Sequence, residues 1–79
     1  MNDIVWDNIM LTEFRSLARL SPDEEKVLQY WADEKSVVEM SFALNVSTRT
    51  VDRIRDRIRS KYDAVQIYTP LLPKRNIVS

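Results

Sequence analysis

Three serines in the middle of the sequence stand where a helix can begin, and this spacing limits the chain to a helical fold. Ser21 is followed three residues later by Glu24, and Ser36 is followed three residues later by Glu39. In such a capping box the serine hydroxyl accepts from the third helical N–H, and the glutamate accepts from the serine N–H. Ser47 is a third capping residue, without the glutamate. The sequence therefore predicts three helices that begin at these serines.

Apolar spacing predicts a further helix before Ser21. An apolar face recurs at steps of four, four and three residues, which is one side of an α-helix. The residues of this face are Trp6, Met10, Phe14 and Leu17. We expect this helix to run from about Asp3 to Leu20.

The ends of the other helices are predicted from the same signals. The second should end near Asp33 or Glu34, and the third at Asn45, which tolerates a left-handed backbone. The fourth should reach about Tyr62, with a short extension through 64–65. Proline at 70 and 73 favours an extended tail. The sequence predicts an all-α domain over 1–79: an apolar helix at 1–20, a helix-turn-helix core at 21–65 and an extended proline-containing tail at 66–79.

The third helix has apolar residues on two sides. Its inner face is predicted to consist of Val37, Met40, Ala43 and Leu44. Val38 and Phe42 lie on the opposite side. We expect these two to pack on the first helix or on the tail, with a partner surface as the alternative.

Composition excludes most enzyme classes and metal sites. The chain has no cysteine, histidine or glycine, so it lacks thiolate ligands, the commonest general base and a glycine-rich phosphate loop. We expect no enzymatic activity, no cofactor and no metal. No run of about 18 apolar residues predicts a membrane span, and the acidic first residues do not resemble a signal peptide. A cytoplasmic protein is expected.

Charge is divided between the two halves of the chain although the net charge is zero. Residues 1–46 hold nine acids and four bases, net −5, whereas residues 47–79 hold eight bases and three acids, net +5. This asymmetry indicates an electrostatic surface in the second half, with an ordinary mixed surface as the alternative.

The third and fourth helices have the layout of a helix-turn-helix, in which the second helix enters the major groove of DNA. At about 100° per residue, an inward stripe of the fourth helix holds Val51, Ile54, Ile58 and Tyr62. The opposite side holds Arg49, Arg53, Asp56, Arg57 and Ser60. The alternative is a solvated helix with internal ion pairs, Asp52 with Arg55 and Asp56 with Arg59 or Arg53.

Residues 20–62 resemble two families, the sigma factor region four that reads the −35 promoter element and the DNA-binding domain of LuxR-type regulators. The matching residues are Leu20, Ser21, Glu24 or Glu25, Val27 and Leu28, then Ser36, Glu39, Met40 and Leu44, then Val46, Ser47, Thr50, Val51, Ile58 and Lys61. The LuxR-type domain ends in a further helix, which the proline tail replaces here, so the sigma-like resemblance fits better. The core-binding regions of a complete sigma factor are absent, which favours a small autonomous regulator.

The resemblance implies roles for individual residues. Thr48, Arg49 and Arg53 stand at base-contacting positions, and Thr50 stands at a backbone contact. Asp52 replaces a residue that is usually basic, which implies an altered sequence preference, weaker binding or acceptance of a cytosine amino group. Asn45 replaces the usual turn glycine.

We therefore expect a sequence-specific regulator of double-stranded DNA. The expected phosphate contacts come from Ser36, Ser47, Thr50, Arg57 and Lys61, and Lys74 and Arg75 either touch phosphate or are solvated. The apolar face of the first helix, Trp6, Met10, Phe14 and Leu17, is a candidate homodimer surface or completes the core. The alternative function is a protein-interaction module that binds RNA polymerase or another regulator through the acidic first half or the Val38 and Phe42 side.

Overall fold

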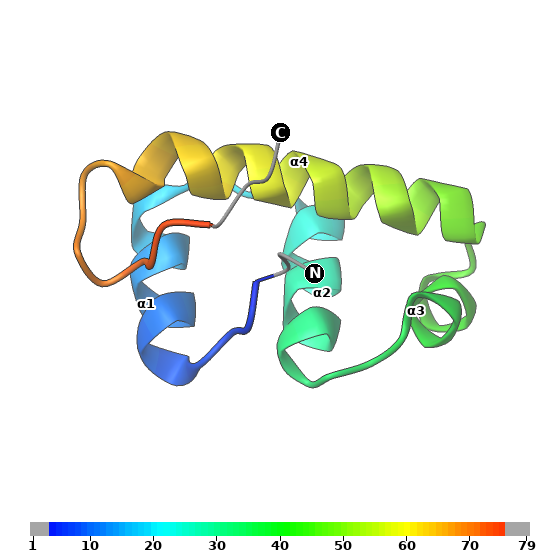
Figure 1. Ribbon diagram of the computed structural model, residues 1–79. Helices are drawn as coiled ribbons and strands as arrows, with labels where there is room; N and C mark the ends of the chain where they lie inside the picture. The colour runs from blue at the N-terminus through cyan, green and yellow to red at the C-terminus, as the bar shows by residue number, and fades with distance from the viewer. Residues whose placement is uncertain (1–3, 76–79) are drawn as a thin grey trace.

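The computed structural model describes residues 4–75 and contains four helices in that part of the chain. They are α1 (Asn8–Leu17), α2 (Pro22–Ala32), α3 (Val37–Leu44) and α4 (Thr48–Gln66). The long α4 crosses α1 and α2, which lie side by side, and α3 lies under the amino-terminal end of α4 (Figure 1). Because α4 packs against each of the other three helices, it organises the fold. The predicted all-α class is confirmed.

The helix starts predicted from the serines are confirmed. Ser21 and Ser36 form complete capping boxes with Glu24 and Glu39. The Ser47 hydroxyl accepts from the backbone N–H of Thr50 at 3.1 Å. Each of these contacts spans three residues, so local sequence decides where α2, α3 and α4 begin.

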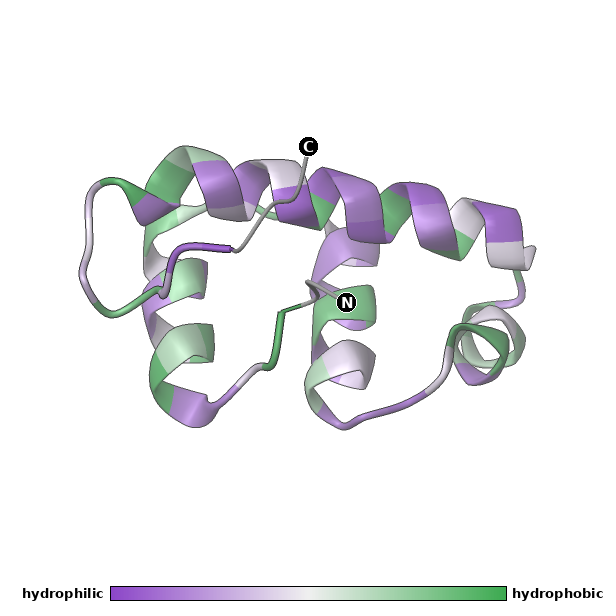
Figure 2. Cartoon of the chain, in the orientation of Figure 1, coloured by the Kyte–Doolittle hydropathy of each residue, from purple (hydrophilic) through white to green (hydrophobic). Residues whose placement is uncertain are grey.

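The core is built around one aromatic cluster beneath α4. Trp6 lies 5.2 Å from Phe14, 5.8 Å from Trp31 and 5.7 Å from Tyr62 between ring centroids. Phe14 and Tyr62 are fully or almost fully buried. Figure 2 shows α4 as a mainly hydrophilic ribbon with hydrophobic residues at intervals, as expected of a helix that covers a core with one side.

The first helix begins later and ends earlier than predicted. Asp7 is its N-cap, with the carboxylate accepting from the N–H of Met10 at 2.8 Å, and the helix ends at Leu17 instead of Leu20. Asp3, the predicted start, lies outside the described residues. Trp6 precedes the helix in an extended segment yet is only 9% exposed. The prediction that Trp6 belongs to the first helix is wrong, because a residue before the helix can also reach the core when the chain folds back.

The candidate dimer surface is also wrong. Trp6, Met10 and Phe14 are buried in the chain's own core, and only Leu17 of that set is substantially exposed, at 42%. The N-terminal apolar face completes the core, which was the alternative, and these three side chains are not available to a second copy.

The expected packing of the outer side of α3 is wrong. Val38 is 54% exposed and Phe42 is 82% exposed, so neither packs on α1 or the tail. Ala43, predicted to face inward, is exposed as well. The reason is the position of α3, which lies at the end of α4 opposite to α1 (Figure 1).

The fourth helix runs to Gln66, one residue past the predicted extension through 64–65. The predicted extended tail is wrong for the described residues, because turns at 67–68 and 70–71 bring the chain back onto the fold. Leu72 is 1% exposed, and the Tyr62 hydroxyl donates to the backbone carbonyl of Pro73. The guanidinium of Arg75 donates to Asp63, with 2.8 Å between Nε and Oδ1. The expected phosphate contact of Arg75 would therefore compete with Asp63, whose pKa is lowered chiefly by this hydrogen bond.

Candidate nucleic-acid interface

A three-residue turn joins α3 to α4 and fixes their relative orientation. Asn45 adopts the left-handed conformation, with φ 55° and ψ 47°, as its place at the helix end predicts. The N–H of Val46 donates to the carbonyl of Ser41 at 3.0 Å, and Ser47 then caps α4. The turn is therefore held by hydrogen bonds on both sides.

The inward stripe of α4 is buried as predicted. Val51, Ile54, Ile58 and Tyr62 are each no more than 4% exposed. Burial of this stripe fixes the rotation of α4 about its own axis, so the residues on the other side must face away from the core.

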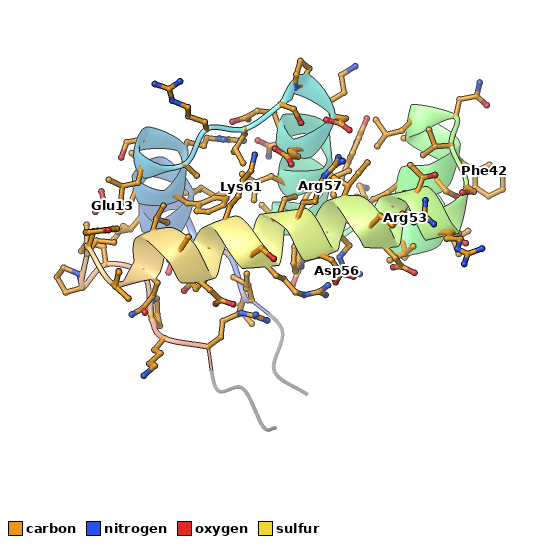
Figure 3. All side chains as sticks on the ribbon, turned by 90° about the horizontal axis from the view of Figure 1, so that it is seen from above. Glu13, Phe42, Arg53, Asp56, Arg57 and Lys61 are labelled. Atoms are coloured by element: carbon orange, nitrogen blue, oxygen red, sulfur yellow. The ribbon has the colours of Figure 1, made fainter. Side chains whose placement is uncertain are left out.

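Arg49 and Arg53 lie on that outward side, in the first two turns of α4. Both side chains are exposed, and within residues 4–75 neither makes a hydrogen bond or an ion pair. Figure 3, viewed from above, shows Arg53 on the part of α4 that adjoins α3. Thr48, the first residue of the helix, is exposed beside them. These are the three residues for which base contacts were predicted.

Arg57 and Lys61 lie farther along α4 and are paired within the chain. Arg57 contacts Asp23 at 2.9 Å and Glu24 at 3.2 Å, and Lys61 contacts Glu24 at 2.5 Å. The predicted phosphate contacts of both residues stay predictions, because such contacts would compete with these carboxylates. This pairing was not predicted, because 34 residues separate Asp23 from Arg57 and no local pattern joins them.

The two carboxylates at the start of α2 are held in their charged form. The pKa of Asp23 is lowered, mainly because its carboxylate accepts from the Ser21 hydroxyl. Burial acts to raise the pKa of Glu24, but hydrogen bonds from Lys61 and Ser21 outweigh it and lower the pKa. Asp23 and Glu24 therefore stay ionised opposite their basic partners at neutral pH.

Two further arginines of α4 stack on an aromatic ring. The guanidinium carbon of Arg55 lies 4.4 Å from the Trp31 ring centroid, and that of Arg59 lies 5.1 Å from it. Arg59 also pairs with Asp56 at 2.7 Å, one of the internal pairs expected as an alternative. A tryptophan beside two arginines from another helix is a tertiary contact that helix periodicity does not reveal.

The hydroxyl groups predicted to contact phosphate take part in helix caps. Ser36 and Ser47 accept from backbone N–H groups, and the Thr50 hydroxyl lies 3.1 Å from that of Ser47. A phosphate contact by these groups stays a prediction.

In the part of the chain that the structure describes, no group of acidic, histidine or cysteine residues could hold a metal ion. The same residues contain no helix with the length and apolar character of a membrane span.

Comparison with known proteins gives one match. The family model described as "Bacterial regulatory proteins, luxR family" matches residues 18–67. No curated protein and no solved structure matches the chain. The resemblance to sigma factor region four, favoured above on account of the tail, stays a prediction. Since the matched residues make up more than half of the chain and include α2, α3 and α4, the chain belongs to the luxR family of bacterial regulatory proteins.

Proposed function

We propose that the chain is a sequence-specific DNA-binding transcription regulator that places the amino-terminal half of α4 in the major groove. The observation that carries this proposal is the pair of outward-facing arginines, Arg49 and Arg53, which have no partner among the described residues. A guanidinium fork matches the O6 and N7 atoms of guanine, or a phosphate, with two hydrogen bonds.

The surrounding elements support this placement. The major groove is about 12 Å wide and admits one helix, while a preceding helix crosses above it. Here α3 precedes α4 through a rigid turn, so α3 would lie above the groove. Thr48 would contact a base, and Ser36, Ser47 and Thr50 lie at helix amino ends, where N–H groups attract phosphate.

Binding of duplex DNA by a double variant, Arg49→Ala with Arg53→Ala, tests the proposal. The chain is first used to select sites from random DNA, and affinity is then measured by fluorescence anisotropy. We expect the double variant to lose about a hundredfold in affinity, because each base-contacting arginine contributes about 1–3 kcal/mol.

The control removes the same charge elsewhere. Arg15 and Arg19 belong to α1 and the segment after it, and both are exposed. Arg15→Ala with Arg19→Ala should change affinity less than about threefold through long-range charge alone. Equal losses in the two double variants, or wild-type affinity that does not fall with salt, would refute the proposal.

A second candidate function, binding of RNA polymerase or another regulator, is favoured by the exposure of Phe42 and Val38 on α3. Val38 and Phe42 are four residues apart and so lie on one side of α3, and contiguous exposed apolar surface is typical of interaction sites. Capture of polymerase from nuclease-treated lysate, lost in Phe42→Ser but kept in Arg49→Ala, would support it. Capture that is equal for both variants would count against it.

A further inference from the structure

A carboxylate stands among the side chains proposed to read DNA. Asp52 follows the buried Val51, is exposed, and lies three residues after Arg49 and one before Arg53. At about 100° per residue, its side chain leaves the helix about 60° from that of Arg49. If Arg49 and Arg53 enter the major groove, Asp52 therefore enters it as well.

The Asp52 carboxylate is not neutralised within residues 4–75. It makes no hydrogen bond or ion pair there, and the guanidinium of Arg55, one turn later, lies over Trp31. Asp56 differs, because it pairs with Arg59 at 2.7 Å. Asp52 would thus enter the groove with both carboxylate oxygens unused by the described residues of the protein.

Only one base edge suits such a group. An ionised carboxylate accepts hydrogen bonds and donates none. In the major groove, guanine presents two acceptors, thymine an acceptor and a methyl group, and adenine a donor beside an acceptor. Cytosine presents its N4 amino donor alone, so it binds a carboxylate without a repulsive neighbour on the same base.

We infer that Asp52 is a specificity-determining residue that requires cytosine at one position of the DNA site. This inference rests on the proposed function, because Asp52 can read a base only if α4 enters the groove. The carboxylate repels phosphate and the acceptor-bearing bases, so it adds selectivity at the expense of general affinity.

Selection of bound sites from random DNA tests the inference, with wild type compared to Asp52→Ala. We expect wild type to select cytosine at a position where Asp52→Ala accepts any base. Exchange of that cytosine for thymine should weaken wild-type binding about tenfold or more and leave Asp52→Ala nearly unchanged. Asp56→Ala, which removes an equal charge from the same helix, should select the wild-type site.

A chemical substitution in the DNA checks the contact at the atomic level. Pyrimidin-2-one lacks the N4 amino group of cytosine, and at the selected position it should weaken wild-type binding while Asp52→Ala binds both duplexes equally. If wild type and Asp52→Ala select the same bases, Asp52 does not read DNA, and the proposed function stands. If wild type selects no DNA at all, the proposed function and this inference fail together.

Discussion

One carboxylate, that of Glu24, joins the start of α2 to the flank of α4. One of its oxygens accepts from the backbone N–H of Ser21 at 2.9 Å and from Lys61, and the other forms an ion pair with Arg57 at 3.2 Å. The residue is 3% exposed, and a buried charge is tolerated only when it is paired and hydrogen-bonded. Arg57 and Lys61 of α4 are therefore both engaged in a contact that stabilises the fold.

The variant Glu24→Gln should reveal how much this charge contributes to stability. The amide oxygen of glutamine can still cap the N–H of Ser21, but it has no charge for Arg57 and Lys61. We expect the free energy of unfolding at pH 7 to fall by about 2 kcal/mol, measured by urea denaturation. Glu13→Gln is the control, because Glu13 makes no ion pair among the described residues. A loss of equal size in the control would contradict the assignment.

The effect of Glu24→Gln should depend on pH. The folded-state pKa of Glu24 is lowered, so the unfolded state binds the proton more readily. The stabilisation is then present above the unfolded pKa of about 4.3 and is lost as pH falls through the folded value. The stability difference between wild type and variant should shrink below about pH 4.3. A difference that stays constant below that pH would show that it does not come from the charge.

At the scale of the elements, predictions from local contacts succeeded and those from apolar spacing succeeded only in part. The caps at Ser21, Ser36 and Ser47 and the left-handed Asn45 each depend on residues within one turn, so the sequence contains all the information needed. The start of the first helix was missed because Asp7 had been assigned to the helix interior.

The outward-facing residues of the candidate site were predicted from the sequence, but the contacts of the other basic residues of α4 with α2 were not. The inward stripe of α4 determines where Arg49 and Arg53 point, and that stripe is visible in the periodicity. The neighbours of Arg57 and Lys61 lie on α2, and the ring under Arg55 belongs to Trp31. The packing of one side of α4 against α2 is a tertiary property, and no local pattern of this sequence predicts it.

The turn between α2 and α3 contains a residue whose replacement should stabilise the fold. Glu34 has φ 63°, a left-handed value that costs most residues about 1–2 kcal/mol and glycine almost nothing. The greater freedom of glycine in the unfolded chain offsets only part of this relief, so Glu34→Gly should still raise the melting temperature by about 4 °C. Asp33 has φ −81°, so the control Asp33→Gly should lower it. Calorimetry that finds Glu34→Gly no more stable than wild type would contradict the expectation.

For the molecule as a whole, the segment after α4 closes the core. Leu72 is 1% exposed, whereas its neighbour Leu71 is 49% exposed. Leu72→Ala should reduce the free energy of unfolding by about 2–4 kcal/mol through lost burial and a new cavity. Leu71→Ala should cost less than about 1 kcal/mol. Urea denaturation of the two variants makes the comparison, and similar losses would show that the segment is not part of the core.

Fewer basic residues of α4 are available to a ligand than the sequence indicated. Of the six basic residues from Arg49 to Lys61, two pair with carboxylates of α2 and two stack on Trp31. The remaining two, Arg49 and Arg53, lie at the end of α4 that adjoins α3. The part of α4 available to a polyanion is therefore its amino-terminal end, and most of the basic charge of α4 stabilises the fold.

This distribution predicts a weak salt dependence of DNA binding. Each phosphate neutralised by the protein contributes about −0.9 to the slope of log affinity against log salt concentration. With two available arginines per chain, the slope should be no steeper than about −2 for each bound copy, since an arginine that contacts a base neutralises no phosphate, and Arg57→Ala should leave it unchanged. Anisotropy titrations between about 50 and 200 mM salt measure both slopes. A wild-type slope of about −3 per copy, reduced by about one in Arg57→Ala, would mean that Arg57 leaves Asp23 and Glu24 for a phosphate when DNA binds.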